Sequence, residues 1–125
     1  MKVLVVEDQP AELKLARLVL GASGMDVEGV PAAEPAMAAI RHHRPHLILL
    51  DLELPGRNGL SLARQLKASP ETRDICIVAI TSYPERYPRA AALDAGCDAY
   101  VKKPLDTRQL PGFLRRMAAG ESAPG

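Results

Sequence analysis

Aromatic residues are scarce in this chain: its 125 residues include one Phe, three Tyr and no Trp. Since 47% of the residues are nevertheless hydrophobic, a core must be built mainly from aliphatic side chains. There are only two cysteines, Cys76 and Cys97, which excludes a disulfide framework and gives no metal-ligand spacing. We interpret them as reduced thiols of a cytosolic protein.

Neither an excess of charge nor a long hydrophobic run is present. The formal net charge is +1, so bulk electrostatics give no reason to expect binding to nucleic acid or to a membrane. The first apolar run, Val3–Val6, is too short for a signal peptide or a membrane span, and acids follow it at once. We therefore expect one soluble, cytoplasmic domain.

What the chain does contain is a regular alternation of short apolar runs with longer amphipathic segments. The runs predict five strands, at Val3–Val6, Asp26–Val30, Leu47–Leu50, Ile75–Ile80 and Ala99–Val101. The amphipathic segments predict helices over residues 10–20, 34–43, 58–68, 89–95 and about 110–117. This strict alternation predicts an α/β fold, with a parallel sheet covered by helices on both faces.

Prolines constrain the starts of the last two helices. Pro84 and Pro88 predict that the fourth helix begins late, near Pro88 or Arg89, because an interior proline costs about 3 kcal/mol. Pro111 predicts that the last helix either starts near Leu110 or has a distorted first turn.

Polar residues capable of chemistry follow four of the predicted strands. Glu7-Asp8 follow the first strand, Asp51 the third, Thr81 the fourth and Lys103 the fifth. In an open parallel sheet, ligands bind at the carboxyl ends of the strands, so these groups should meet at one edge. A single acid there would more commonly be a helix cap or a solvated loop residue. The joint pattern is what predicts a site.

Three clustered carboxylates repel one another, since two unit charges at 4 Å interact by about 4 kcal/mol at an effective dielectric of 20. A hard divalent cation removes this conflict, and oxygen ligation favours Mg²⁺. A phosphoryl group accepted by one carboxylate would then be neutralised by the metal on one side, and by Lys and Thr on the other.

The ordered set of motifs resembles the receiver domain of two-component response regulators. It comprises Glu7-Asp8, residues 51–60 (Asp-Leu-Glu-Leu-Pro-Gly-Arg-Asn-Gly-Leu), Thr81-Ser82 and Lys103-Pro104, and the likeness covers about residues 1–118. The resemblance implies a flavodoxin-like (βα)5 three-layer sandwich with strand order 2-1-3-4-5. We expect a stand-alone receiver domain over residues 1–119, with 120–125 as a flexible tail or a linker stub.

The same resemblance implies the metal site. Asp51 would be the phosphoacceptor and also a ligand of Mg²⁺. Asp8 would bind the ion directly and Glu7 mainly through water, with the backbone carbonyl of Glu53 as a further ligand.

It also implies a switch. Thr81 would move toward the phosphoryl group, Tyr100 would follow it, and Lys103 would pair with the phosphoryl oxygens, while Lys102 would be an exposed neighbour. The Lys103–Pro104 bond is predicted to be cis, although few X-Pro bonds are.

The implied function is a phosphorylation-dependent signalling switch. A sensor histidine kinase or a histidine phosphotransfer protein would supply the phosphoryl group. The face formed by the fourth helix, fifth strand and fifth helix would then change its affinity for a downstream protein or a second copy of the chain. No direct DNA binding, membrane association or turnover-enzyme activity is expected, beyond catalysis of its own phosphorylation and slow dephosphorylation.

Alternatives remain open. The chain could be a phosphorylation-independent interaction module, although a degenerate receiver usually lacks part of this set. Asp51-x-Glu53 faintly resembles the motif of aspartate-nucleophile phosphatases, in which the second acid is Asp. A flavin carrier is disfavoured because the first loop is acidic and would repel a flavin phosphate.

Two further sets of residues stand out. The resemblance to receivers implies that Glu53 and Tyr83 flank the path of the water that attacks the phosphoryl group, so a bulky Tyr83 is a candidate for slowing phosphoryl loss. We interpret the histidine cluster of His42, His43 and His46 as an exposed helix end.

Overall fold

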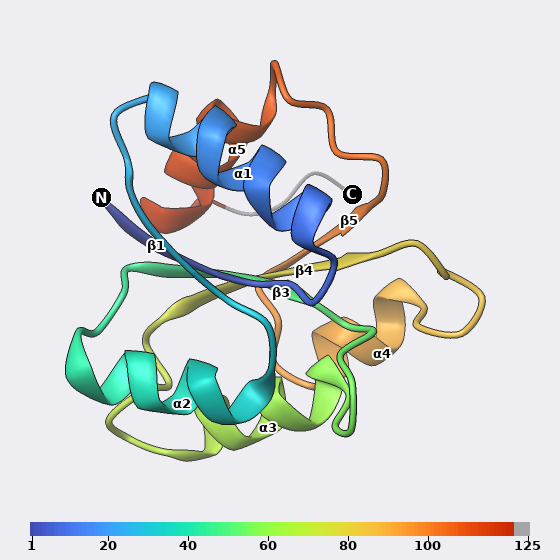
Figure 1. The fold of residues 1–125 in the computed structure, drawn as a ribbon. Coiled ribbons are helices and arrows are strands. Elements are labelled where there is room, and N and C mark those ends of the chain that lie inside the picture. The colour runs from blue at the N-terminus through green and yellow to red at the C-terminus, as the bar shows by residue number, and fades with distance from the viewer. Residues whose placement is uncertain (122–125) are drawn as a thin grey trace.

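The sheet consists of five parallel strands in the order β2-β1-β3-β4-β5 (Figure 1). The computed structural model describes residues 1–121, so residues 122–125 of the predicted tail lie outside the described residues. The strands are β1 (Lys2–Val6), β2 (Asp26–Val30), β3 (Leu47–Asp51), β4 (Cys76–Thr81) and β5 (Ala99–Lys102). All five predicted strands and their predicted order are confirmed.

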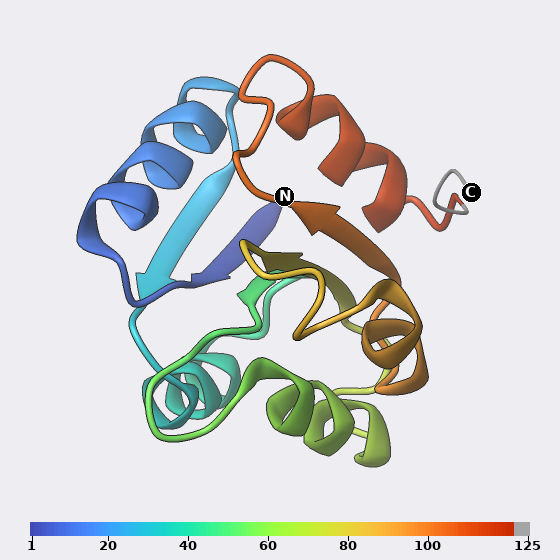
Figure 2. The same ribbon diagram turned by 90° about the vertical axis from the view of Figure 1, so that its right-hand side faces the viewer.

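Five helices cover the two faces of the sheet. They are α1 (Pro10–Ala22), α2 (Ala33–His42), α3 (Gly59–Ala68), α4 (Arg89–Asp94) and α5 (Leu110–Ala118). Figures 1 and 2 show α1 and α5 on one face and α2, α3 and α4 on the other, which gives three layers. The predicted flavodoxin-like (βα)5 architecture is therefore confirmed.

The central strands read as continuous apolar runs because both of their faces are buried. In β1, Val3 and Val5 pack in the cluster beneath α1 and α5, while Leu4 and Val6 pack in the cluster beneath α2 and α3. All five residues of β3 are buried, including its last residue, Asp51. Packing in the two core clusters therefore fixes the position of β3, the strand that ends in Asp51.

Local sequence explains where the helices begin. The Asn58 side chain accepts a hydrogen bond from the Ser61 N–H at 2.9 Å and so caps α3. Pro88 precedes the first residue of α4, and α5 starts at Leu110 with Pro111 in its first turn. The late start of α4 is therefore confirmed, as is the first of the two options for α5.

Helix α1 is longer than predicted, and some of its leucines are exposed. It continues through Gly21 to Ala22, because an interior glycine weakens a helix without ending it, and Gly24, with a φ of 87°, follows in the turn. Ala16 and Leu20 are buried, whereas Leu15 and Leu18 remain 47% and 61% exposed. Among the described residues, no helix is both long and apolar enough to cross a bilayer.

Candidate functional site

The acids predicted at the strand ends do converge. Glu7, Asp8 and Asp51 each offer a carboxylate oxygen, and these three atoms lie within 4.8 Å of one another. Glu7 and Asp51 are each only 2% exposed. Lys103 follows β5 and enters the same pocket, where its Nζ lies 2.7 Å from Glu7 Oε1 and 3.0 Å from Asp51 Oδ2. Residues separated by up to 96 positions in the chain thus form one buried ionic cluster.

The charges of this cluster do not balance. Burial, together with a hydrogen-bonding contact to Asp51, raises the pKa of Glu7 to about 8, although the contact with Lys103 acts in the opposite direction. Burial alone would lower the pKa of Lys103, but its hydrogen bonds to Glu12, Glu7 and Asp51 outweigh burial and raise that pKa. Burial and the neighbouring acid thus favour the protonated form of Glu7, in a pocket that brings three acids to one lysine.

This donor set fits a hard divalent cation. Ligand oxygens at about 2.1 Å from one Mg²⁺ lie at most about 4.2 Å apart, so atoms within 4.8 Å need only a small adjustment or one bridging water. Both Glu7 oxygens already accept hydrogen bonds, from Lys103 Nζ and from the Gln9 N–H at 3.2 Å. Glu7 is therefore better placed to bind an ion through water than directly. Asp8 is less buried, so its carboxylate is more open to direct contact with an ion.

The loop after β3 shapes the surroundings of Asp51. The Glu53 N–H donates to Asp51 Oδ1 at 2.9 Å, and the Gly59 N–H donates to the Leu52 carbonyl at 3.0 Å. A Cβ at Gly59 would lie 2.7 Å from the Asp51 carbonyl oxygen, so only glycine fits without displacing backbone. The first turn of α3 is thereby packed directly against the end of β3.

Thr81 ends β4 and is fully buried. Its hydroxyl donates to Glu53 Oε2 and accepts from the Tyr83 N–H at 2.9 Å, and the Ser82 N–H donates to Glu53 Oε1 at 3.0 Å. The sequence analysis assigned Glu53 a backbone carbonyl ligand and a place beside the path of attacking water, and both roles stay predictions. The contact of the Glu53 side chain with Thr81 was missed.

The predicted switch tyrosine lies one strand away from Thr81. Tyr100 pairs with Ala79 across β4 and β5, and it is 7% exposed. Its hydroxyl donates to the Tyr87 carbonyl oxygen, and the Arg89 guanidinium carbon lies 5.5 Å from its ring centroid. Tyr100 is thus hydrogen-bonded to the loop between β4 and α4, which follows Thr81.

Two further predictions concern the end of β5. The Lys103–Pro104 bond is cis, as predicted. Lys102 is exposed, also as predicted. The neighbouring lysines therefore differ in environment, and only Lys103 reaches the acids.

Glu12 is the site residue that the sequence analysis did not find. Its Oε2 lies 2.8 Å from Lys103 Nζ, while its side chain remains 47% exposed. The available signal was its position in the first turn of α1, which begins at Pro10 directly beyond the acids at the end of β1. Recognising it required knowing that the Lys103 side chain extends toward that turn.

The histidines form no second metal site within residues 1–121, where Glu7, Asp8 and Asp51 are the one candidate group. The Lys2 N–H donates to His46 Nδ1 at 2.9 Å, and the Lys2 ammonium contacts His43 Nδ1. This arrangement lies at the opposite edge of the sheet, where β1 begins.

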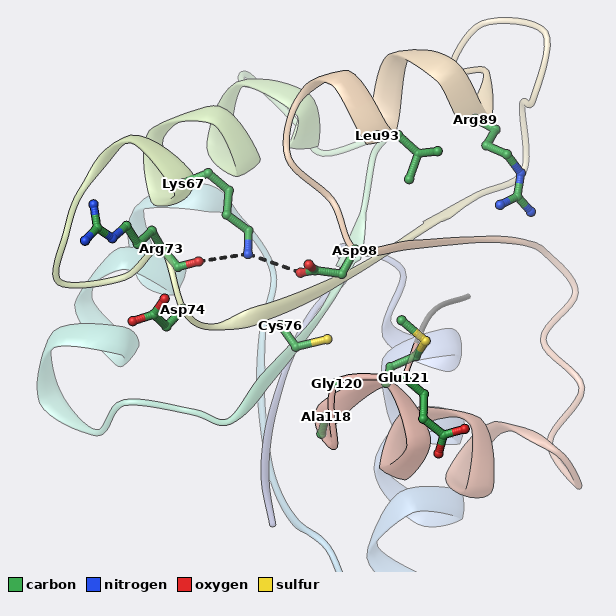
Figure 3. A pocket seen from close by; sticks show the side chains of 11 residues that line it. Lys67, Arg73, Asp74, Cys76, Arg89, Leu93, Asp98, Ala118, Gly120 and Glu121 are labelled. Carbon is green, nitrogen blue, oxygen red and sulfur yellow. Dashed lines mark hydrogen bonds and ion pairs between the residues drawn. The ribbon is translucent and has the colours of Figure 1, made fainter. Parts of the chain in front are cut away.

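A separate surface pocket lies near the starts of β4 and β5 (Figure 3). Lys67 Nζ lies 3.1 Å from Asp98 Oδ2 there and also donates to the Arg73 carbonyl at 3.0 Å (Figure 3). Lys67 and Asp98 thus form an ion pair in this pocket, which does not border the acidic cluster.

Comparison with known proteins agrees with this geometry. The response regulator receiver domain family matches residues 3–115, and the chain belongs to that family. It is 35% identical over 112 residues to the polar-differentiation response regulator DivK of Brucella anthropi, covering 90% of this chain and 89% of DivK. Receiver domains of this family act in two-component signalling, which is the function class that the fold and site define.

Two other similarities are informative. The phosphate regulon transcriptional regulatory protein PhoB of Rhizobium meliloti is 35% identical over 116 residues, which cover 93% of this chain but only 51% of PhoB. The chain thus spans about half the length of that relative. The receiver domain of sensor histidine kinase PA1611 from Pseudomonas aeruginosa, which holds magnesium in its active-site cleft, superposes with a TM-score of 0.86 at 28% identity, covering 95% of this chain and 98% of that domain.

Proposed function

We propose that this receiver domain is a phosphorylation-dependent switch in which Asp51 accepts a phosphoryl group with the help of Mg²⁺. The observation that carries the proposal is the convergence of three carboxylate oxygens within 4.8 Å, with Lys103 Nζ 3.0 Å from Asp51. The magnesium in the cleft of the similar PA1611 receiver supports the choice of cation. A bound Mg²⁺ would neutralise the carboxylates and the oxygens of the incoming phosphoryl group.

The chemistry is a single transfer from a phosphohistidine. A carboxylate oxygen of Asp51 forms a bond to phosphorus as the phosphorus–nitrogen bond breaks, and the departing imidazole takes up a proton from solvent. Lys103 would hold one phosphoryl oxygen through its ammonium, and the Thr81 hydroxyl another. Water later attacks phosphorus and regenerates the Asp51 carboxylate with release of inorganic phosphate. The domain therefore carries a signal and is not a turnover enzyme.

The phosphoryl donor would be a sensor histidine kinase or a histidine phosphotransfer protein. The response to phosphorylation would be a change in the binding affinity of the face formed by α4, β5 and α5. Tyr100 supports this route because its hydroxyl links β5 to the loop that follows Thr81. A downstream protein, or a second copy of the chain, would bind that face once Thr81 and Tyr100 have moved.

The alternative is an interaction module with the same fold that works without phosphorylation. The complete set of Asp51, Thr81 and Lys103 in one pocket favours the switch, because a module that never binds a phosphoryl group has no need of a buried lysine against two buried acids.

Mass spectrometry of the intact protein after treatment with acetyl phosphate tests the proposal. We expect one added phosphoryl group with Mg²⁺, almost none with a chelator, and none for Asp51→Asn under either condition. Labelling of Asp51→Asn to the wild-type level would refute the assignment of Asp51. Absence of labelling in the folded wild-type protein with Mg²⁺ would favour the interaction module.

A further inference from the structure

The Thr81 hydroxyl has no hydrogen left for a phosphoryl group. A hydroxyl carries one hydrogen, and that of Thr81 points to Glu53 Oε2. The oxygen of the same hydroxyl accepts from the Tyr83 N–H at 2.9 Å. Since Thr81 is completely buried, no water competes for these positions. Any new acceptor must therefore replace the Glu53 carboxylate.

Glu53 is itself held from two directions. Its other carboxylate oxygen accepts from the Ser82 N–H at 3.0 Å, while its own N–H donates to Asp51 Oδ1 at 2.9 Å. The residue thus connects the phosphoacceptor on β3 to both Thr81 and Ser82 at the end of β4. These bonds join the two loops that flank the acidic pocket.

We propose that Glu53 is a positioning residue that restrains the switch: its carboxylate holds the Thr81 hydroxyl and must release it before Thr81 binds the phosphoryl group. The inference rests on the proposed function and extends it to the regulation of the same site. The Glu53 carboxylate occupies the hydrogen-bonding role that a phosphoryl oxygen would take. Lys103 differs in this respect, because an ammonium has three hydrogens and can keep other partners when it gives one to a new acceptor.

The restraint makes phosphorylation compete with a charge-assisted hydrogen bond. Such bonds are about twice as strong as neutral ones, so removing the carboxylate favours the phosphoryl-bound state. Glutamine is the informative replacement because Thr81 and Ser82 donate to different oxygens of Glu53, and the amide NH2 group that replaces one of these oxygens cannot accept a hydrogen bond. Glu53→Gln therefore weakens the restraint, and Glu53→Ala removes it.

Beryllofluoride, a stable mimic of the phosphoryl group, gives an equilibrium measurement with saturating Mg²⁺. We expect its affinity, followed by NMR of the Thr81 methyl and the Tyr83 amide, to rise about fivefold in Glu53→Gln and about tenfold in Glu53→Ala. The Thr81 methyl of the free variants should also shift toward its position in the beryllofluoride-bound wild type. Glu85→Gln, which removes one negative charge from the loop between β4 and α4, is the charge control and should change affinity less than twofold.

The decisive comparison repeats the Glu53 substitutions with Thr81→Ala. If Glu53 acts through the Thr81 hydroxyl, its removal has no effect on affinity in that background, whereas Thr81→Ser keeps the hydroxyl and restores the effect. An equal gain with and without the hydroxyl would overturn the inference, as would unchanged or weaker binding in the Glu53 variants. Absence of binding by the folded wild type would instead refute the proposed function.

Discussion

The Lys103 ammonium lies 2.8 Å from the Glu12 carboxylate, although 91 positions separate the two residues in the sequence. Its remaining hydrogens point to Glu7 and Asp51, at 2.7 and 3.0 Å. Glu12 lies outside the group of acids placed to share a cation. It would therefore stay paired with Lys103 if a metal ion bound the other carboxylates.

We predict that Glu12→Gln accelerates labelling by acetyl phosphate. The substitution removes a negative charge that repels acetyl phosphate. It also weakens the hydrogen bond through which Glu12 competes with a phosphoryl oxygen for Lys103. The Glu12 side chain is 47% exposed, so the gain should stay below about fivefold, the equivalent of about 1 kcal/mol. Initial rates should be measured at saturating Mg²⁺, since losing a negative charge near the site also weakens metal binding.

Salt provides the control for this effect. Raising the ionic strength screens an exposed charge, so the rates of wild type and Glu12→Gln should converge in about 1 M salt. A slower variant at saturating Mg²⁺ would contradict the prediction and would mean that Glu12 is needed to orient Lys103.

The convergence of the site could be predicted because it follows from topology. Once the apolar runs indicated parallel strands, Asp8, Asp51, Thr81 and Lys103 had to lie at one edge. This is a property of the backbone that needs no knowledge of side-chain directions.

The contacts of Glu12 and Glu53 could not be predicted in the same way. Each contact depends on the conformation of a long side chain that extends from one loop or helix end to another. No spacing of residues in the sequence indicates which conformation such a side chain adopts. The same limit applies to α1, where the period of the apolar residues did not reveal that Leu15 and Leu18 stay exposed. Helical periodicity predicts which face of a helix is apolar. How much of that face is buried depends on the elements that pack against it.

Glu7 should make the stability of the metal-free protein depend on pH. Its pKa is about 8 in the folded state, above the ordinary value of 4.5, so folding favours its protonated form. This contribution is complete below about pH 4.5 and is lost as the pH rises through 8. We expect the free energy of unfolding in EDTA to fall over this range, by at most about 1.4 kcal/mol per pH unit.

Urea titrations of wild type and Glu7→Gln isolate that contribution, because the variant cannot ionise at this position. The difference between the two proteins should grow with pH in EDTA. It should shrink or reverse in Mg²⁺, which stabilises the ionised carboxylate. Parallel pH profiles in EDTA would show that Glu7 keeps an ordinary pKa in the fold.

Tyr83 is predicted to slow the loss of the phosphoryl group. Its N–H donates to Thr81, its side chain is 49% exposed, and the Arg86 guanidinium carbon lies 5.6 Å from its ring centroid. A bulky ring two residues beyond Thr81 would restrict the approach of water to phosphorus. We expect several-fold faster decay of the phosphorylated protein for Tyr83→Ala, measured by mass spectrometry after removal of acetyl phosphate. Tyr83→Phe keeps the ring and should decay like wild type, so faster decay of both variants would implicate the hydroxyl instead.

Gly59 supplies the last prediction, because space and not backbone conformation makes glycine necessary there. An added Cβ would lie 2.7 Å from the Asp51 carbonyl oxygen and 2.8 Å from Leu52 Cα, both backbone atoms that cannot turn aside. Gly59→Ala should therefore destabilise the protein by about 1–3 kcal/mol, the usual cost of forcing an extra carbon into a packed site. Displacement of the loop next to Asp51 should also slow labelling by acetyl phosphate.

Gly21 is the matched control for this substitution, since it too lies in a helix but has no atom within 4 Å of an added Cβ. Gly21→Ala should stabilise the protein by up to about 1 kcal/mol through helix propensity and leave labelling unchanged. Urea unfolding of both variants makes the comparison. If Gly59→Ala were as stable as Gly21→Ala, the start of α3 could move away from β3 at little cost, and the contact between Gly59 and Asp51 would not fix the phosphoacceptor.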